Sequence, residues 1–339
     1  MKPQSSTPWG RPGLADATAW DQAALGDLAS YCESQRTTGL LVMANRRTVL
    51  ERNWPVAAGS DLFERRYLHG TARDGALRED VASQQKSLVA LLAAIAVDDG
   101  RLDLEQPVSN YVGRGWSHAD PAQELAIVVR HLLEMCSGLD DALRFEAPAG
   151  TRHHYNTPAY ALMLPVLEAA QGQSIGALTQ TRLTGPLGMV DTAWCQRSNE
   201  LASFLGNPRG LVTTPRDLAR LGQFVLDGGV AEDGARLVSS AGLSAIFRRT
   251  ALHPAYGRLW WLNGGTHWVV PNRGQGDGSL VPTAPADALF ALGSENRVLM
   301  IVPSLALILV RLGQQAPDAD LREKMASGLA RAMLRTAIE

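Results

Sequence analysis

The most strongly apolar stretch of the chain lies between residues 83 and 99. Its apolar side chains cover almost the whole circumference of a helix, and they are Leu88, Val89, Leu91, Leu92, Ile95 and Val97. A helix that is apolar all round is buried on every side. Gly100 follows as a natural C-terminal stop. The pattern therefore predicts a central, buried helix over residues 83–99.

Short runs of strand character lie near both ends of the chain. Residues 39–44 and 48–52 are separated by the turn Asn45-Arg46-Arg47, which predicts a hairpin. Strand character returns after residue 255, in four runs at residues 259–262, 289–292, 298–302 and 305–312. We expect strands from both ends of the chain to pair in one antiparallel sheet.

The middle of the chain, from about residue 105 to 250, has mainly helical periodicity, as at residues 128–135, 158–170 and 216–226. Helices are also predicted near the ends, at residues 18–34 and 319–338, after an irregular arm over residues 1–16. This order predicts a mixed α/β (α+β) fold, with an antiparallel sheet flanked by helices and an inserted all-helical region. We expect a discontinuous sheet domain over residues 1–100 and 255–339, and a mainly helical domain over residues 101–254.

Composition and charge exclude several classes of protein. Hydrophobic residues make up 45% of the chain and charged residues 19%, which excludes wholesale disorder. The 32 basic and 34 acidic residues nearly cancel, so a nucleic-acid partner is not expected. The apolar run over residues 88–97 is about half as long as a membrane span, so no membrane partner is expected.

The cysteines and the N-terminus bear on the compartment. Cys32, Cys136 and Cys195 are odd in number and far apart, which favours reduced thiols. The first ten residues have no apolar segment typical of a secretion signal. We therefore expect a cytoplasmic protein.

Lysine is scarce in this chain, and its placement is informative. The lysines are Lys2, Lys86 and Lys324, and Lys86 alone lies inside the body of the sequence. A desolvated amine can lose its proton, whereas a guanidinium effectively cannot. In Ser83-Gln84-Gln85-Lys86, the hydroxyl and the amine lie three residues apart on one helix face. Lys86 is thus a candidate general base for a Ser83 nucleophile, and the alternative is a Ser N-cap followed by a solvated Lys.

A second candidate group is Tyr155-Asn156-Thr157, before Pro158. Thr157 is the expected N-cap of the helix that Pro158 begins. Tyr155 could act as an acid or base if a cation such as Lys86 lowers the pKa of its phenol. The alternative is a packed aromatic side chain with a satisfied hydroxyl.

Metal and nucleotide chemistry have little support. The seven histidines form no HExxH motif and no helical ligand pair, and His153 and His154 are expected to be loop residues. The sequence also has no G-x-S-x-G elbow and no Gly-rich phosphate loop. We expect no metal and no cofactor.

Several segments, in this order and spacing, resemble the serine β-lactamase and penicillin-binding-protein superfamily, and its class C-like branch most of all. They are Ser83-Gln84-Gln85-Lys86, residues 94–108 (AIAVDDGRLDLEQPV), 129–139 (VRHLLEMCSGL), 155–157, 213–220 (TTPRDLAR), 256–262 (YGRLWWL) and 302–313 (VPSLALILVRLG). The resemblance spans about residues 80 to 310. It implies a β-lactamase-like fold and a hydrolase that works through an acyl-enzyme.

The resemblance also implies roles for individual residues. Ser83 is the implied nucleophile, and Lys86 and Tyr155 are the implied pair that handles its proton. The implied oxyanion hole uses the N–H of Ser83 and an N–H near Ser294, because the family's Lys-Thr-Gly motif aligns with Ala291-Leu292-Gly293. Gly293, Ser294, Asn156 and Thr157 are therefore candidate substrate-binding residues.

Two departures from the family pattern bear on the substrate. Thr157 stands where relatives have the Asn of Tyr-x-Asn, and Ala291 stands where β-lactamases have a Lys that faces the substrate carboxylate. Both changes weaken recognition of a penicillin. The resemblance therefore favours the esterase and amide-hydrolase members, including those that resemble 6-aminohexanoate-oligomer hydrolases. Arg297 and Arg258 are candidates for a replacement cation.

We expect a serine hydrolase that cleaves a small carboxylic ester or amide through acyl-Ser83. Trp116, Trp260, Trp261 and Trp268 are candidate pocket walls. Three alternatives remain open: a β-lactamase or D,D-peptidase, an acyltransferase to an acceptor other than water, and a non-catalytic binding or sensor domain. The sequence does not indicate the oligomeric state.

Overall fold

The fold is described by a computed structural model that covers residues 20–271 and 274–333. A six-stranded antiparallel sheet with the order β2-β1-β12-β11-β10-β7 is its largest element. Its strands are β1 (Thr37–Ala44), β2 (Arg47–Asn53), β7 (Trp261–Leu262), β10 (Leu289–Gly293), β11 (Arg297–Val302) and β12 (Leu307–Gly313). Both chain ends supply strands to this antiparallel sheet, as the sequence predicts.

The centre of this sheet is mainly apolar, apart from the buried arginines Arg297 and Arg311. Every residue of β11 and β12 is buried, because helices cover both faces of the sheet. Leu41 of β1 pairs with Val310 of β12, and Met300 of β11 pairs with Leu309. Continuous apolar runs are typical of strands that are buried on both faces. This accounts for the strength of the strand signal at residues 298–302 and 305–312.

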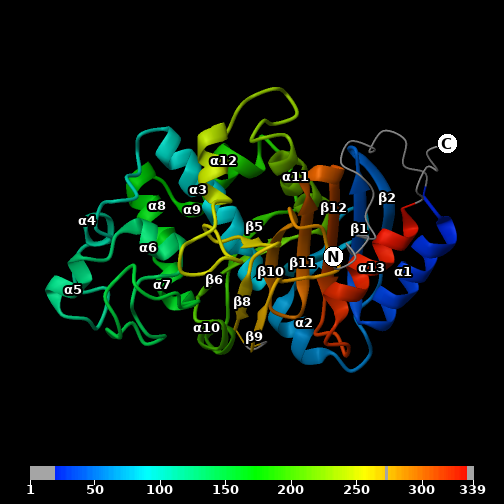
Figure 1. The fold of residues 1–339 in the computed structure, drawn as a ribbon, viewed down its shortest axis with the longest axis horizontal. Helices are drawn as coiled ribbons and strands as arrows, with labels where there is room; N and C mark the ends of the chain where they lie inside the picture. Colours follow the sequence, from blue (N-terminus) through cyan, green and yellow to red (C-terminus); the bar gives the residue numbers. More distant parts are fainter. Residues whose placement is uncertain (1–19, 272–273, 334–339) are drawn as a thin grey trace, which may run out of the picture.

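Helices form layers on either side of the sheet. Figure 1 shows α1 and α13 side by side at one end of the molecule, and α4, α5, α6 and α8 at the opposite end. The helices on the six-stranded sheet are α1 (Gln22–Ser34), α11 (Pro215–Leu226) and α13 (Leu321–Ala332), whereas α3 (Gln85–Asp98) packs against α8 and α12. The remaining helices are α2 (Asp61–Tyr67), α4 (Ser109–Val112), α5 (Pro121–Leu125), α6 (Val129–Leu133), α7 (Thr157–Ala161), α8 (Met163–Gln171), α9 (Ile175–Thr179), α10 (Asn199–Leu205) and α12 (Ser240–Ile246).

A second sheet, which the sequence did not predict, lies beside the central helix. It has the order β3-β4-β6-β5, with β3 (Leu68–Thr71), β4 (Leu77–Asp80), β5 (Ala193–Gln196) and β6 (Arg209–Thr213). A further hairpin joins β8 (His267–Val270) to β9 (Gly274–Asp277). Strands β5 and β6 come from the region that was predicted to be mainly helical. Helix α11, from the same region, packs on β1, β11 and β12, so residues 101–254 also contribute to the layer around the six-stranded sheet. These strands are short and partly polar, so their periodicity is weak.

The central helix starts later than the periodicity indicates. A 3-10 turn, η2 (Ala82–Gln84), precedes α3 (Gln85–Asp98), so Ser83 lies in this turn rather than at the first α-helical position. Ala82 has a φ of 49°, in the left-handed region that an Ala rarely adopts. Gly100, with a φ of 66°, follows the helix as predicted. The buried helix therefore delivers Ser83 on a sharp turn at its N-terminal end.

The structure also bears on the cysteines and on membrane-spanning helices. Cys32 and Cys136 are buried and Cys195 is half-buried, and none of the three forms a disulfide, as predicted. Within residues 20–271 and 274–333, no helix has the length and apolarity that crossing a membrane requires. The predicted arm over residues 1–16 lies outside the described residues, as does the end of the closing helix predicted over residues 319–338.

Candidate active site

Ser83 and Lys86 meet at the N-terminal end of the central helix. Lys86 Nζ lies 3.0 Å from Ser83 Oγ and 3.1 Å from Thr157 Oγ1. The Lys86 side chain is only 2% exposed, while Ser83 lines a pocket that opens to solvent. The 3-10 turn and the first turn of α3 bring the two side chains together, as the three-residue spacing predicts.

The environment of Lys86 disfavours its charged form. Burial lowers the pKa of Lys86 well below its usual value of 10.5, and the positive charge of Arg197 lowers it further. The amine lies over two aromatic rings, 4.9 Å from the centroid of Tyr155 and 4.7 Å from that of Tyr160. No carboxylate ion-pairs with Lys86 among the described residues. An amine in this setting is held in the form that can accept a proton.

Tyr155 lies beside the same two groups. Burial raises the pKa of the Tyr155 phenol to about 12, and a side-chain hydrogen-bond interaction with Ser83 opposes that rise. The ring stacks on Trp261 with the centroids 5.7 Å apart. The expectation that Lys86 acts as a cation that lowers the pKa of Tyr155 is therefore corrected. Because the amine is itself driven toward its neutral form, it is not a cation that would lower the pKa of the Tyr155 phenol.

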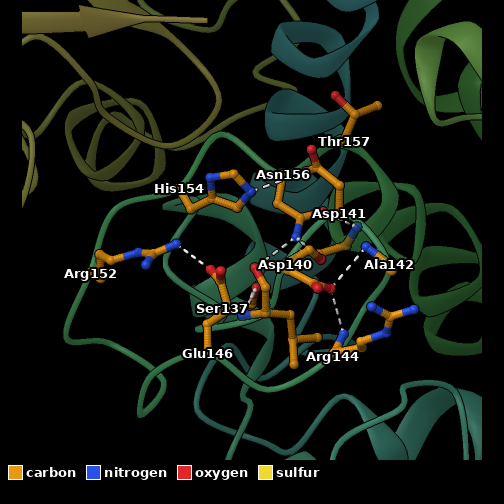
Figure 2. Close-up of polar contacts among 12 residues, drawn as sticks. Ser137, Asp140, Asp141, Ala142, Arg144, Glu146, Arg152, His154, Asn156 and Thr157 are labelled. Atoms are coloured by element: carbon orange, nitrogen blue, oxygen red, sulfur yellow. Dashed lines mark hydrogen bonds and ion pairs between the residues drawn. The ribbon is translucent and has the colours of Figure 1, made fainter.

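The segment that carries Tyr155 is fixed by Asn156. The N-cap of α7 is Asn156 rather than Thr157, because Asn156 Oδ1 accepts a 2.8 Å hydrogen bond from Ala159 N. Its Nδ2 donates to the carbonyl oxygens of Leu139 and Asp140, and Figure 2 shows Asn156 anchored in this loop. The side chain is 1% exposed and does not line the pocket. Asn156 thus fixes the loop, and the oxygen and nitrogen of its side-chain amide are both engaged in hydrogen bonds to the backbone rather than directed to the pocket.

Thr157 instead points toward the reacting groups. It lines the pocket, and its hydroxyl accepts a hydrogen bond from Lys86 Nζ. Thr157 therefore orients the amine from the position at which relatives of this chain carry the Asn of Tyr-x-Asn. The N-cap of α7 lies one residue earlier than predicted, and Thr157 still contacts Lys86.

Strand β10 forms the opposite side of the nucleophile turn. Gly293 and Ser294 both line the pocket that Ser83 lines. A Cβ at Gly293 would collide with the carbonyl oxygen of Val81, so the strand approaches the turn more closely than any other residue would allow. Ala291 is buried in the core, whereas Leu292 lines the pocket.

These groups open into one pocket of about 600 Å³. Its apolar walls come from four segments: the C-terminal end of α10, strand β7, the end of strand β8, and strand β10. The residues involved are Phe204, Leu205, Trp261, Val270, Pro271 and Leu292. Of the four candidate Trp residues, Trp261 alone lines this pocket. Trp260 is fully buried, Trp116 bonds to Ser109, and Trp268 lies over Gly276.

Neither arginine proposed as a replacement cation is free to bind an anion. The Arg297 guanidinium is fully buried and donates to Glu79 Oε2 from Nη2 at 3.0 Å and from Nε at 3.2 Å. Arg258 lies 3.4 Å from Glu134 and does not line the pocket. Arg322, in the first turn of α13, is the half-buried guanidinium of the pocket wall.

The histidines show no metal site. No group of three or more His, Cys, Asp or Glu side chains within residues 20–271 and 274–333 has the geometry to hold a metal ion. His153 packs on His253 with the centroids 4.4 Å apart, and His154 lies 3.0 Å from Asp141 at the pocket mouth. Both histidines are loop residues, as expected, and they point in different directions.

Sequence reasoning missed the charged groups beneath the nucleophile turn. Asp80 and Arg197 form a bidentate ion pair of 2.6 and 2.8 Å in which both side chains are almost fully buried. Asp80 also accepts a hydrogen bond from Ala82 N, directly before Ser83. The adjacent acids Glu79 and Asp80, followed directly by the apolar Val81 and Ala82, were the available signal. Their distant partners, Arg297 and Arg197, cannot be deduced from spacing.

Comparison with known proteins agrees with this geometry. The beta-lactamase family model matches residues 28–333. An uncharacterized protein of Alkalihalophilus pseudofirmus is 25% identical over 260 residues, which cover 68% of this chain and 72% of that protein.

Solved structures of other proteins have a similar fold. A class C beta-lactamase is similar with a TM-score of 0.66 and 18% identity, over 93% of this chain and 97% of that one. A D-stereospecific amidohydrolase from a Streptomyces species is similar with a TM-score of 0.61 and 15% identity, over 89% of this chain and 97% of that one. Because the family model covers nearly the whole described chain, the protein belongs to the beta-lactamase family of serine hydrolases.

Proposed function

We propose that this chain hydrolyses a small, uncharged carboxylic ester or amide through an acyl-Ser83 intermediate. The observation that carries the proposal is the contact between Ser83 Oγ and Lys86 Nζ, at 3.0 Å, with the amine 2% exposed. A buried neutral amine beside a hydroxyl can accept its proton as the oxygen attacks a carbonyl carbon. A solvated lysine would be protonated and could not.

The remaining groups have complementary roles in the proposed reaction. We assign the oxyanion hole to the N–H groups of Ser83 and Ser294, because both residues line the same pocket. Thr157 orients the amine while it holds the proton. Tyr155, a neutral phenol between Lys86 and the pocket, passes that proton to the leaving group. Water then enters the pocket and clears the acyl group through the same residues in reverse.

The charge and polarity of the pocket support an uncharged substrate. Ala291 and Leu292 replace the polar residues of the Lys-Thr-Gly motif, and Leu292 presents an apolar side chain to the pocket. The charge of Arg297 is neutralised by Glu79. Phe204 is 64% exposed at the pocket mouth, and Leu205, Trp261 and Val270 extend the apolar wall. Apolar walls with a few converging polar groups are typical of sites for small neutral ligands.

One observation favours β-lactam hydrolysis as a second candidate function. Arg322 lines the same pocket, and it has no ion pair among the residues that the structure describes. A guanidinium there could attract the carboxylate of an anionic substrate. A β-lactamase would then use Arg322 in place of the missing Lys, and a comparison of substrates separates the two candidates.

Turnover of p-nitrophenyl butyrate tests the proposal. We expect the wild-type protein to release p-nitrophenol in a reaction that is saturable in ester, and Ser83→Ala to release it no faster than buffer. Arg182→Gln is the control and should retain wild-type turnover, because Arg182 pairs with Asp99 just after the C-terminal end of the central helix. A wild-type protein that does not exceed buffer with esters of several acyl lengths or with anilides contradicts the proposal.

A further inference from the structure

The Asp80–Arg197 ion pair lies directly beneath the turn that carries Ser83. Arg197 Nε and Nη2 donate to Asp80 at 2.6 and 2.8 Å, and the side chains are 2% and 0% exposed. A buried pair of this kind contributes little net stability over apolar side chains of the same volume, because desolvation offsets the attraction. Its presence beside the candidate nucleophile therefore points to a role in geometry or electrostatics.

The acidic half of the pair holds the backbone before the nucleophile. Asp80 Oδ1 accepts a 2.9 Å hydrogen bond from the N–H of Ala82, the residue with a φ of 49°. A left-handed conformation costs an Ala free energy, so it persists only where its surroundings enforce it. Gly210 leaves the room for this arrangement, because a Cβ there would collide with Asp80 and with Cys195.

The basic half of the pair connects to the residue beside Lys86. Arg197 Nη1 donates to the carbonyl oxygen of Asn207 at 3.0 Å, and Asn207 Nδ2 donates to Gln85 Oε1 at 3.1 Å. The Tyr160 hydroxyl donates to the same Gln85 oxygen, and its ring lies 4.7 Å from Lys86 Nζ. This chain of contacts fixes Lys86 from behind, on the side away from the pocket.

We propose that Arg197, held by Asp80, is a positioning residue for the acylation of Ser83, which fixes the nucleophile turn and sets the charge behind Lys86. The inference rests on the proposed function. The groups that face Lys86 are Ser83 on its own helix, Tyr155, Thr157 and Tyr160 on and before α7, and Arg197 after β5. Arg197 supplies the charge that acts on Lys86, and it favours the neutral amine.

The two effects can be separated by variants. In the double variant Asp80→Asn/Arg197→Gln, the charges are lost, but two amides of similar shape remain in the cavity. Arg197→Lys keeps the charge but loses the bidentate geometry. Arg182→Gln is the matched control, because Arg182 forms a bidentate pair with Asp99 at the other end of the same helix segment.

The readout is the second-order rate of Ser83 labelling by a fluorophosphonate, measured from pH 5 to pH 10 on the full-length protein. Labelling needs the neutral amine, so the rate rises with pH along an acid limb to a plateau. Loss of the Arg197 charge raises the pKa of Lys86, so the limb of the double variant should move to higher pH. Each unit of displacement lowers the rate on the limb about tenfold.

Arg197→Lys should keep the wild-type limb and lose about 10- to 100-fold of the plateau rate, because the turn is less well fixed. Arg182→Gln should match the wild type in both. A double variant with the wild-type limb overturns the inference, whatever its plateau. If the double variant does not fold, the test rests on Arg197→Lys. An acid limb displaced from that of the wild type, or a plateau labelling rate equal to that of the wild type, then overturns the inference. Failure of the wild-type protein to label at Ser83 would instead contradict the proposed function.

Discussion

Gln84 Nε2 donates a 3.1 Å hydrogen bond to the carbonyl oxygen of Ala291, and this contact joins the turn that carries Ser83 to strand β10. Gly293 continues the same seam, with its backbone against the carbonyl oxygen of Val81. The two N–H groups proposed for the oxyanion hole lie on either side of this seam. Their spacing is therefore set by a side-chain amide and by the absence of a Cβ.

Gly293→Ala tests that seam. The added Cβ would meet the backbone of Val81, which cannot turn aside, so we expect β10 to move away from the nucleophile turn. The acylation rate should fall by about 10²- to 10³-fold, the usual effect of losing one oxyanion-hole donor. Gly26→Ala in helix α1, where a Cβ has no neighbour within 4 Å, is the control and should leave the rate unchanged. A Gly293→Ala variant as fast as the control would refute this placement of the oxyanion hole.

Lys86 and Tyr155 should act as one proton-handling unit. Lys86→Ala and Tyr155→Phe are each expected to lower the acylation rate by about 10²- to 10⁴-fold. Because residues of one catalytic unit do not contribute additively, the double variant should be little slower than the slower single variant. The measurement is a double-mutant cycle on single-turnover acylation. Fully multiplicative losses would show two independent roles.

The buried Lys86 should lower the free energy of unfolding of the protein at neutral pH. Its pKa in the folded chain lies well below 10.5, so between those two values the unfolded chain binds the proton more readily. Wild-type folding stability therefore falls as the pH drops below about 10.5 toward the folded pKa. Lys86→Met has no such proton, so its melting temperature should exceed that of the wild type at pH 7.

The difference between the two melting temperatures should shrink as the pH rises toward 10.5. It should be smallest above pH 10.5, where the amine is neutral in both the folded and the unfolded chain. Thermal melts of the two proteins at pH 7 and near pH 11 provide the comparison. The variant should be inactive throughout. A wild-type protein that is the more stable of the two at pH 7 would show that Lys86 is not strained by burial.

The substrate preference should favour neutral esters. An anionic β-lactam lacks its Lys partner here, and a charge-assisted hydrogen bond is worth about 1.5–3 kcal/mol, or a factor of about 10 to 150. We expect a p-nitrophenyl acyl ester to have a higher kcat/KM than nitrocefin. A nitrocefin value as high or higher would point to Arg322 as the replacement cation and promote the β-lactamase alternative. Arg322→Gln would then reduce nitrocefin turnover and spare the ester.

Much of the sheet and the contact between Ser83 and Lys86 could be predicted from the sequence, because their signals are local. The apolar circumference of residues 88–97 predicts burial of the helix, and the Ser83–Lys86 spacing predicts a contact across one turn. The long apolar strands at residues 298–302 and 305–312 are confirmed with small shifts of their ends.

What the sequence did not predict depends on long-range contacts. Residues 78–80 are charged, and they lie in a strand because Glu79 and Asp80 find guanidinium partners more than a hundred residues away. The N-cap of α7 is Asn156 because the 139–140 loop offers carbonyl oxygens to its amide. The state of Lys86 depends on how completely two distant aromatic rings enclose it. Local periodicity carries no information about any of these.

The central claim, that Ser83 is a nucleophile activated by a buried neutral amine, is tested most directly by mapping the site of fluorophosphonate labelling. We predict one modified peptide in the wild-type protein, with the adduct on Ser83. Ser83→Ala should not be labelled and should melt within a few degrees of the wild type, because the partly exposed hydroxyl contributes little packing. An adduct on another serine, or undiminished labelling of Ser83→Ala, would contradict the account.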